Sequence, residues 1–169
     1  MKPVLILSLA FLPFFAVASL AASQQDEVTL RRLVTQDYVT QWSKSEEREF
    51  SMDIARRIYL QEPSLRAIDT DIMQVPKSLY PSTRIRGADA YNRIWPEIFE
   101  NIEYFRNLQV ENLEVEINGD LALTTFDAPG HGRLRGKPKF SSYKNFTLLW
   151  QQTPDGWRIF HEHISDGRK

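Results

Sequence analysis

Apolar residues recur along the first third of the chain at spacings of three and four, with polar or charged residues between them. The first such stripe comprises Leu30, Leu33, Val34, Tyr38 and Trp42. Because one helical turn takes about 3.6 residues, this spacing gathers the stripe on one side and predicts a helix over 27–45. A shorter repeat, at Phe50, Ile54 and Ile58, predicts a second helix that ends before Glu62-Pro63, since the residue before proline avoids helical geometry.

A third helix is predicted over 88–102. Its apolar positions are Tyr91, Ile94, Trp95, Ile98, Phe99 and Ile102. Pro96 lacks a backbone donor and should kink or restart this helix. Before it, 65–71 is predicted as a strand. The segment 73–86 has two prolines and no sustained period, so we expect an ordered loop or a short edge strand that could cover a pocket mouth.

The second half of the chain changes to a period of two. Leu113, Val115 and Ile117 alternate with glutamates until Asn118-Gly119-Asp120, and Asn-Gly is a strong signal for a tight turn between strands. Further strand-rich runs follow at 121–128, 140–152 and 156–165. Three helices followed by a meander of strands predict an α+β domain, with helices covering one face of a curved, mainly antiparallel sheet.

The last strand carries the most informative side chains. A period of two puts one set on a single face: Trp157, Ile159, His161, His163 and Ser165. Two of the chain's three histidines would therefore look the same way. A face that mixes aromatic, aliphatic, imidazole and hydroxyl groups suits the wall of a partly polar pocket.

The N-terminus predicts export. Met1-Lys2 precedes an apolar block, and Ala16-Val17-Ala18 and Ser19-Leu20-Ala21 offer small residues where a signal peptidase cleaves. We interpret 1–21 as a signal peptide and 22–169 as one domain, secreted or periplasmic. After cleavage no later stretch is long and apolar enough for membrane insertion.

Composition narrows the chemistry. The absence of cysteine removes disulfides, thiolate metal ligands and a cysteine nucleophile. A formal charge of −1 gives no reason to expect nucleic acid as a partner. Motifs for serine hydrolases, zinc proteases and nucleotide-binding loops are missing as well. A small, neutral or mildly charged molecule is the more plausible ligand.

Two segments carry a family resemblance. Gly87-Ala88-Asp89-Ala90-Tyr91 opens the predicted third helix, and Asp155-Gly156-Trp157-Arg158-Ile159-Phe160-His161-Glu162-His163-Ile164-Ser165 closes the chain. With the order of elements, they resemble the SnoaL-like families of the NTF2-like, or ketosteroid isomerase-like, superfamily over essentially the whole predicted domain. The resemblance implies a cone: three N-terminal helices packed on a strongly curved antiparallel sheet around a ligand-sized cavity, with frequent homodimers through the outer sheet face.

The histidine pair offers one chemistry. His161 and His163 could act as a general base and a hydrogen-bond partner for substrate, because imidazole titrates near neutrality. The alternative is that both are hydrogen-bonded wall residues without a catalytic task. A zinc site with His131 as third ligand is a weaker option, because His131 is predicted in a glycine-rich connection. We expect neither a metal nor a cofactor.

A second chemistry follows from the resemblance. Asp69 stands about where ketosteroid isomerases carry their proton-shuttling carboxylate, and Tyr38 resembles their oxyanion-binding tyrosine. On one cavity, Asp69 would remove a proton beside a carbonyl while Tyr38 stabilised the enolate oxygen. The second oxyanion donor has no clear counterpart, because Asp127 is predicted at a strand end that water reaches. Tyr38 could equally be a core residue.

The expected function is binding of a small apolar or polycyclic molecule, with or without isomerase-, cyclase- or dehydratase-type acid/base chemistry on a carbonyl. Trp42 and Trp95 either pack against the sheet or stack on a flat ligand, and Tyr38, Trp157 and Ser165 would complete its binding site. The alternative is a non-catalytic module that dimerises or associates with another protein.

Overall fold

The protein's structure, a computed structural model, describes residues 13–69, 84–107 and 109–167. Its elements are α1 (Pro13–Arg32), the π-helix η1 (Leu33–Tyr38), α2 (Val39–Gln41), α3 (Asp53–Ile58), β1 (Arg66–Asp69), β2 (Arg84–Arg86), α4 (Ala88–Glu100), β3 (Ile102–Asn107), β4 (Glu111–Asn118), β5 (Leu121–Leu134), β6 (Lys139–Thr153) and β7 (Gly156–Asp166). The contiguous elements α1, η1 and α2 make one helical unit, and α3 and α4 are the other two. Together with a seven-stranded sheet they confirm the α+β prediction.

The first helical unit runs through α1, η1 and α2 without interruption. Its buried stripe, Leu30, Val34, Tyr38 and Trp42, steps by four residues. In a regular α-helix that step overshoots each turn, so the stripe would rotate away from the core. The wider π turns, marked by the Val39 N–H bonding to the Val34 carbonyl, absorb the overshoot and keep Tyr38 and Trp42 facing inward.

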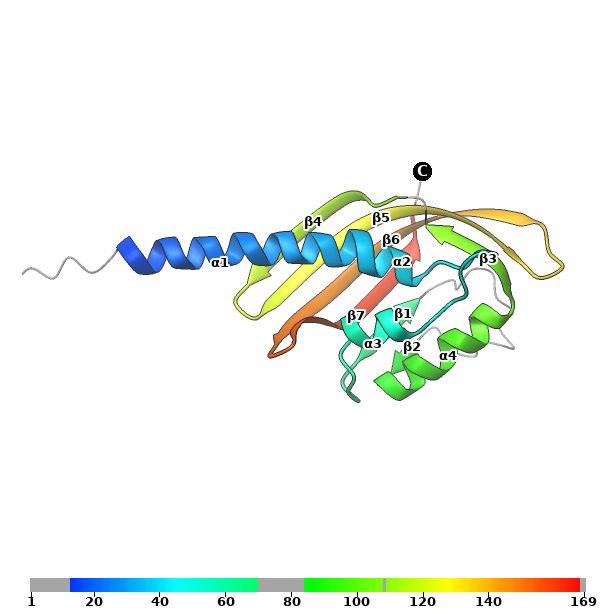
Figure 1. The fold of residues 1–169 in the computed structure, drawn as a ribbon, viewed down its shortest axis with the longest axis horizontal. Coiled ribbons are helices and arrows are strands. Elements are labelled where there is room, and N and C mark those ends of the chain that lie inside the picture. The colour runs from blue at the N-terminus through cyan, green and yellow to red at the C-terminus, as the bar shows by residue number, and fades with distance from the viewer. Residues whose placement is uncertain (1–12, 70–83, 108, 168–169) are drawn as a thin grey trace, which may run out of the picture.

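The sheet is mixed and mainly antiparallel. Its strands lie in the order β2-β1-β7-β6-β5-β3, with β4 also pairing with β5, and the β1–β7 pair is parallel. The helices pack on one face, and the N-terminal turns of α1 project beyond the sheet (Figure 1). Strong curvature of the sheet stays a prediction.

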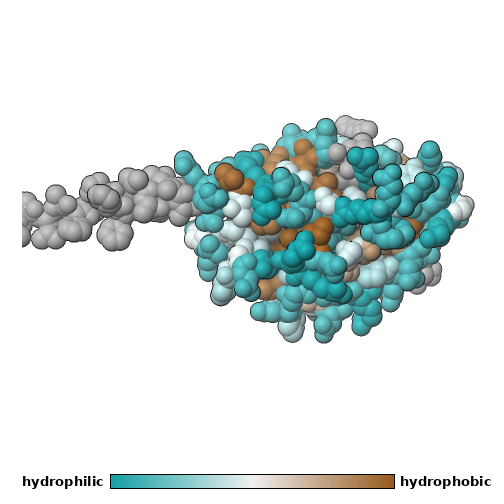
Figure 2. Space-filling view, in the orientation of Figure 1, coloured by the Kyte–Doolittle hydropathy of each residue, from teal (hydrophilic) through white to brown (hydrophobic). Residues whose placement is uncertain are grey.

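The core lies between the helices and the inner face of the sheet. Side chains alternate along β5 between buried and half-exposed, as a sheet covered on one side requires. The surface seen in Figure 2 is largely hydrophilic, with apolar residues scattered among charged ones. Over the described ranges, the large apolar side chains that are exposed are Val28 and Leu121. None of the helices there combines the length and hydropathy that a membrane span requires.

Several local predictions are confirmed. The hairpin forms at Asn118-Gly119-Asp120, where Gly119 takes the positive φ of 64° that favours glycine in such turns. For 73–86 we expected an ordered loop or a short edge strand, and its last three residues form the short edge strand β2. Residues 70–83 lie outside the described residues. The expected restart of the third helix at Pro96 is wrong, because α4 runs through this proline to Glu100 as one helix.

Two strand boundaries differ from the sequence interpretation. Ile102 begins β3, a strand that was not predicted, instead of ending the third helix. The glycine-rich stretch was interpreted as a connection, yet Gly130, His131 and Gly132 lie inside β5. A Cβ on Gly132 would come within 3.0 Å of the Phe105 ring and 2.9 Å of the Phe140 ring. The glycines therefore let aromatic rings lie directly on the strand.

Candidate functional site

β7 contains a bulge that reverses its faces halfway along. Opposite β6, Leu149 pairs with His161 but Trp150 pairs with Ile159, so Phe160 is an extra residue. Trp157 and Ile159 point inward before the bulge, and Glu162 and Ile164 point inward after it. The prediction that one face carries Trp157, Ile159, His161, His163 and Ser165 is therefore wrong, because one inserted residue breaks the period of two.

The last three of those residues lie on the outer face of the sheet. His161, His163 and Ser165 are half-exposed and register with Leu149, Thr147 and Asn145 of β6. Burial, together with the charge of nearby His163, lowers the pKa of His161. The two imidazoles thus line the outside of the sheet and not its interior.

Glu162 is the polar centre of the interior. Its side chain has no exposure to solvent, and three tyrosine hydroxyls donate to it. Tyr38 Oη lies 2.7 Å from Oε2, Tyr59 Oη bonds the same oxygen, and Tyr91 Oη lies 3.2 Å from Oε1. A buried carboxyl is costly unless its lone pairs are satisfied, so the three hydroxyls explain how the core holds it.

Each tyrosine reaches Glu162 from a different element. Tyr38 ends the π segment, Tyr59 follows α3 and Tyr91 lies at the end of the first turn of α4. Backbone pairing brings Tyr59 to β7, because the Leu60 N–H donates to the Ile159 carbonyl at 2.8 Å, just before the bulge. Four segments far apart in sequence therefore converge on one carboxyl group.

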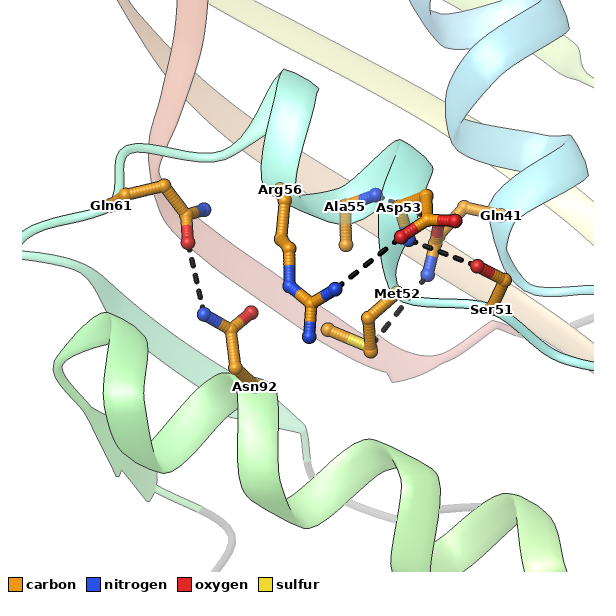
Figure 3. A network of polar contacts seen from close by, with 8 residues as sticks. All are labelled: Gln41, Ser51, Met52, Asp53, Ala55, Arg56, Gln61 and Asn92. Carbon is orange, nitrogen blue, oxygen red and sulfur yellow. Dashed lines mark hydrogen bonds and ion pairs between the residues drawn. The ribbon is translucent and has the colours of Figure 1, made fainter.

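A second layer of polar contacts holds the helices that carry these tyrosines (Figure 3). The buried Gln41 side chain accepts from the Ala55 N–H at 2.8 Å and contacts Met52 Sδ at 3.9 Å, which joins α2 to α3. Asn92 Nδ2 donates to Gln61 Oε1 at 2.9 Å, which joins the chain after α3 to α4. These contacts fix the relative positions of Tyr38, Tyr59 and Tyr91.

Burial dominates the electrostatics of this group. It raises the pKa of the Glu162 carboxyl, and the hydrogen bonds from Tyr59, Tyr38 and Tyr91 only partly oppose that rise. Burial also raises the pKa of all three tyrosines well above 10, and the Glu162 charge adds to this effect. The tyrosines therefore stay protonated near neutral pH, while Glu162 is the group in the cluster that can gain or lose a proton.

Two tryptophans lie beside this group with unpaired N–H groups. Trp42 is 3% exposed and Trp95 is 2% exposed, and neither indole nitrogen has a hydrogen-bond partner in the described part of the chain. Their ring centroids are 4.5 Å apart, and each ring contacts Tyr91, at 6.2 Å and 5.9 Å between centroids. Buried N–H groups without an acceptor are rare in proteins, so this pair calls for an acceptor.

The other predicted residues are distributed as follows. Asp69 ends β1, is buried, and shares the inner face with Ala67, which pairs with Glu162. Trp157 is also buried, but its indole donates to Asp26 of α1 at 3.0 Å. Asp127 lies within β5, not at a strand end, and accepts from Asn112 and Asn145 on the outer face.

His131 is not part of a metal group. It lies in β5 beside Tyr104, and the described residues hold no cluster of three or more histidine, aspartate or glutamate side chains suited to a metal ion. The option of His131 as a third ligand for His161 and His163 is therefore wrong.

Sequence reasoning missed Glu162 and Tyr59, and identified Tyr91 only as a core position. One signal for Glu162 was present: Ile164 is strongly apolar, yet it is out of phase with Trp157 and Ile159. An odd separation between apolar residues in one strand indicates that the strand changes face between them.

Residues 78–167 match the family of the SnoaL-like domain, more than half of the chain. No curated protein matches this chain. Among solved structures, an NTF2-like superfamily protein from Salmonella enterica serovar Typhimurium shares 15% identity, covers 85% of this chain and 94% of its own, and has a TM-score of 0.66.

Two further structures are similar. The Kfla4162 protein from Kribbella flavida shares 14% identity over 86% of this chain and 93% of its own, with a TM-score of 0.67. An NTF2-like protein with a cystatin-like fold from Novosphingobium aromaticivorans shares 12% identity over 93% of this chain and 92% of its own, with a TM-score of 0.59. At these identities the likeness establishes the fold alone.

Proposed function

This chain belongs to the SnoaL-like domain family, with an NTF2-like fold, and from that premise we propose that it binds a small, mostly apolar molecule that carries a carbonyl group. The ligand lies against Trp42, Trp95 and Tyr91, and its carbonyl oxygen accepts hydrogen bonds from the two indole N–H groups. The observation that carries this proposal is the pair of buried, unpaired indole donors beside the Glu162–tyrosine cluster.

The surroundings of the two indoles favour an apolar ligand. Phe50 stacks on Phe99 with centroids 3.8 Å apart, and Phe99 lies 6.2 Å from the Trp42 ring. Aromatic faces of this kind bind flat hydrocarbon rings through area burial and offset stacking. Two N–H donors in such a wall would orient one acceptor atom, which is how apolar sites achieve specificity.

Glu162 supplies the acid/base part of the proposal. Burial raises its pKa and so favours the protonated form, which can donate a proton; the ionised form can accept one while three tyrosine hydroxyls stabilise the charge. Asp69, on the adjacent parallel strand and the same face, is the second interior carboxyl. A pair of carboxyls in different surroundings suits proton transfer beside a carbonyl, the chemistry of isomerases, cyclases and dehydratases.

Tryptophan fluorescence tests the binding step directly. The full chain is titrated with 1-tetralone, which has a carbonyl on an apolar ring system, and with tetralin, which lacks the carbonyl. We expect saturable quenching by the ketone and binding weaker by about tenfold for the hydrocarbon, because two N–H donors lose their acceptor. Equal affinities for both probes would contradict the role of the indole donors.

Matched variants separate the site from the core. Trp95→Phe keeps an aromatic ring but removes one unpaired donor, so ketone affinity should fall by at least about fivefold. Trp150→Phe is the control, because the Trp150 indole already donates to Thr124 at 2.9 Å. If both variants weaken ketone binding equally, the effect arises from general loosening of the core and the proposed site is wrong.

Export stays part of the proposal. We propose that the chain is cleaved after Ala18 or Ala21 and acts outside the cytoplasm. Within the described side chains, packing of α1 on the core begins at Leu30, and Asp26 makes its bond to Trp157, so cleavage at either site leaves these contacts intact. Intact-mass analysis of the exported protein tests this, and an uncleaved mass would contradict it.

Association through the outer sheet face is the second candidate. One edge carries exposed Arg66 and Arg86, and the opposite edge carries exposed Glu114 and Glu116 on β4. A two-fold axis through this face would bring the basic edge of one copy to the acidic edge of the other. Sedimentation of the full chain should give a dimer that Leu149→Arg dissociates; a monomer at all concentrations would contradict this candidate.

A further inference from the structure

A hollow lies where the chain leaves α2 and meets β3, and neither Trp42 nor Trp95 lines it. Its volume is about 510 Å³, which falls within the usual range for small-molecule sites. Lys44, Arg48 and Arg106 line it together with a single carboxylate, Glu47. Three cations face one carboxylate there, so the lining of this hollow carries a net positive charge. We call it the Lys44 pocket.

Lys44 is unusually buried for a lysine. Its residue is 7% exposed, and its ammonium donates to the Phe99 carbonyl at 2.9 Å. Its ionic partner is Glu49, 3.5 Å away, whose side chain is 85% exposed and therefore well screened by water. Among the described residues Glu49 is the one carboxylate that pairs with Lys44, and it lies in solvent. The buried cation is therefore incompletely compensated, and an anion in the pocket would compensate it.

The two arginines are available to a ligand. Neither the Arg48 nor the Arg106 side chain makes a hydrogen bond or ion pair with another described residue, although both line the pocket. A guanidinium group presents a planar fork of donors that matches the oxygens of a phosphate. Arg133, by contrast, is paired with Glu103.

The backbone beneath these cations is held in place. The Lys44 N–H donates to the Phe105 carbonyl at 2.8 Å, and the Phe105 N–H donates back to Lys44 at 3.0 Å. Ser45 and Arg48 exchange a similar pair, which closes a tight turn. The pocket is therefore preorganised, so ligand binding would lose little chain entropy.

The rest of the lining indicates what the anion is attached to. Phe105 and Val39 form an apolar wall, and three hydroxyl residues complete the rim, Thr40, Ser43 and Ser45. The volume greatly exceeds that of a bare phosphate ion, so the wall leaves room for an apolar or aromatic group. We propose that the Lys44 pocket binds an organic phosphate monoester, with the phosphate dianion on Lys44, Arg48 and Arg106 and its organic group on Phe105.

Calorimetric titration of the full chain at pH 7.5 and low salt tests this. The probes are phenyl phosphate, inorganic phosphate and benzoate. We expect saturable binding of phenyl phosphate and affinities weaker by about tenfold for the other two, since one lacks the apolar group and the other carries a single charge. Salt should weaken the binding of phenyl phosphate.

The matched variants are Arg48→Gln with Arg106→Gln, and Arg57→Gln as control. All three arginines are exposed, and Arg57 lies on α3 outside the pocket. The double variant should weaken phenyl phosphate binding at least about tenfold, and the control should stay within about twofold. Amide shifts in two-dimensional NMR spectra should centre on Lys44 and Phe105.

Three results would overturn the assignment. These are the absence of saturable binding by any probe, equal loss in Arg57→Gln and the double variant, and equal affinity for phenyl phosphate and inorganic phosphate. The first two exclude a site, and the third excludes an organic group in it. None of them depends on the indole site, because Trp42 and Trp95 do not line this pocket.

Discussion

The four tryptophans divide the interior into two regions. On the sheet, Trp150 donates to Thr124 and Trp157 donates to Asp26, so each indole has the partner that a buried N–H requires. On the helical side, Trp42 and Trp95 have no such partner within the described residues. The sheet side therefore has the complete bonding of a structural core, whereas the helical side keeps donors that a bound molecule could satisfy.

Glu162 connects the sheet side and the helical side of the interior. Its backbone is in β7, and its carboxyl accepts from tyrosines of the helical side. Burial raises the pKa of this carboxyl, and the proposed acid/base role would make use of that shift. All four indoles are buried, so burial does not separate a structural core residue from a candidate ligand-binding residue. The difference lies in whether the buried indole N–H has a hydrogen-bond acceptor.

The largest effect is expected from Glu162→Ala. It removes the acceptor of three buried tyrosine hydroxyls at once, so the free energy of unfolding should fall by about 3 kcal/mol or more. Urea denaturation followed by circular dichroism measures this. Glu162→Gln, which keeps an acceptor oxygen, should lose clearly less; equal losses would mean that the hydroxyls find other partners.

The tryptophans give the next largest effect. Trp150→Phe leaves the buried Thr124 hydroxyl without its donor, while Trp95→Phe removes a donor that has no partner. Trp150→Phe should therefore lower the free energy of unfolding by about 1 to 2 kcal/mol more than Trp95→Phe. The same urea experiment compares them. If the order is reversed, the contrast between the sheet side and the helical side fails.

The pH dependence of stability tests the proton on Glu162. Its pKa is raised in the folded chain, so the folded state holds the proton after the unfolded state has lost it, above about pH 4.3. The stability that Glu162 contributes is fully present below that pH and is lost as pH rises through the folded pKa. Compared with Glu162→Gln, the wild type should lose up to about 1.4 kcal/mol per pH unit in that window.

Urea denaturation of both proteins between pH 4 and pH 8 measures the difference. Other titrating groups are common to the two proteins, so their contributions cancel. If the wild type instead gains stability over the variant as pH rises, the tyrosine hydrogen bonds outweigh burial and the folded pKa of Glu162 is depressed.

The smallest effect is expected at the outer face. His163→Ala changes a half-exposed side chain outside the interior, so the free energy of unfolding should change by at most about 0.5 kcal/mol. Ketone affinity in the fluorescence titration should stay within about twofold. A loss comparable to that of Trp95→Phe would show that the outer face, and not the helical side of the interior, binds the ligand.

Much of the architecture was readable from periodicity. The stripe from Leu30 to Trp42, the helical spacing around Trp95 and the Asn118-Gly119 turn are local patterns, and each element formed where they predicted it. The closing motif, at 155–165, also resembles the SnoaL-like families and so indicated the fold. Local propensity and alternation suffice for these features because neighbours within one element decide them.

What only the tertiary structure decided is where side chains from distant segments meet. The bulge at Phe160 arises from pairing between β7 and β6, and it exchanged the histidines for Glu162 on the inner face. Tyr38 lies in η1, Tyr59 directly follows α3 and Tyr91 lies in α4, and no spacing in the chain relates them to Glu162. The physical reason is that the sequence determines alternation within a strand, whereas register, bulges and the burial of a carboxyl depend on the partners that the fold supplies.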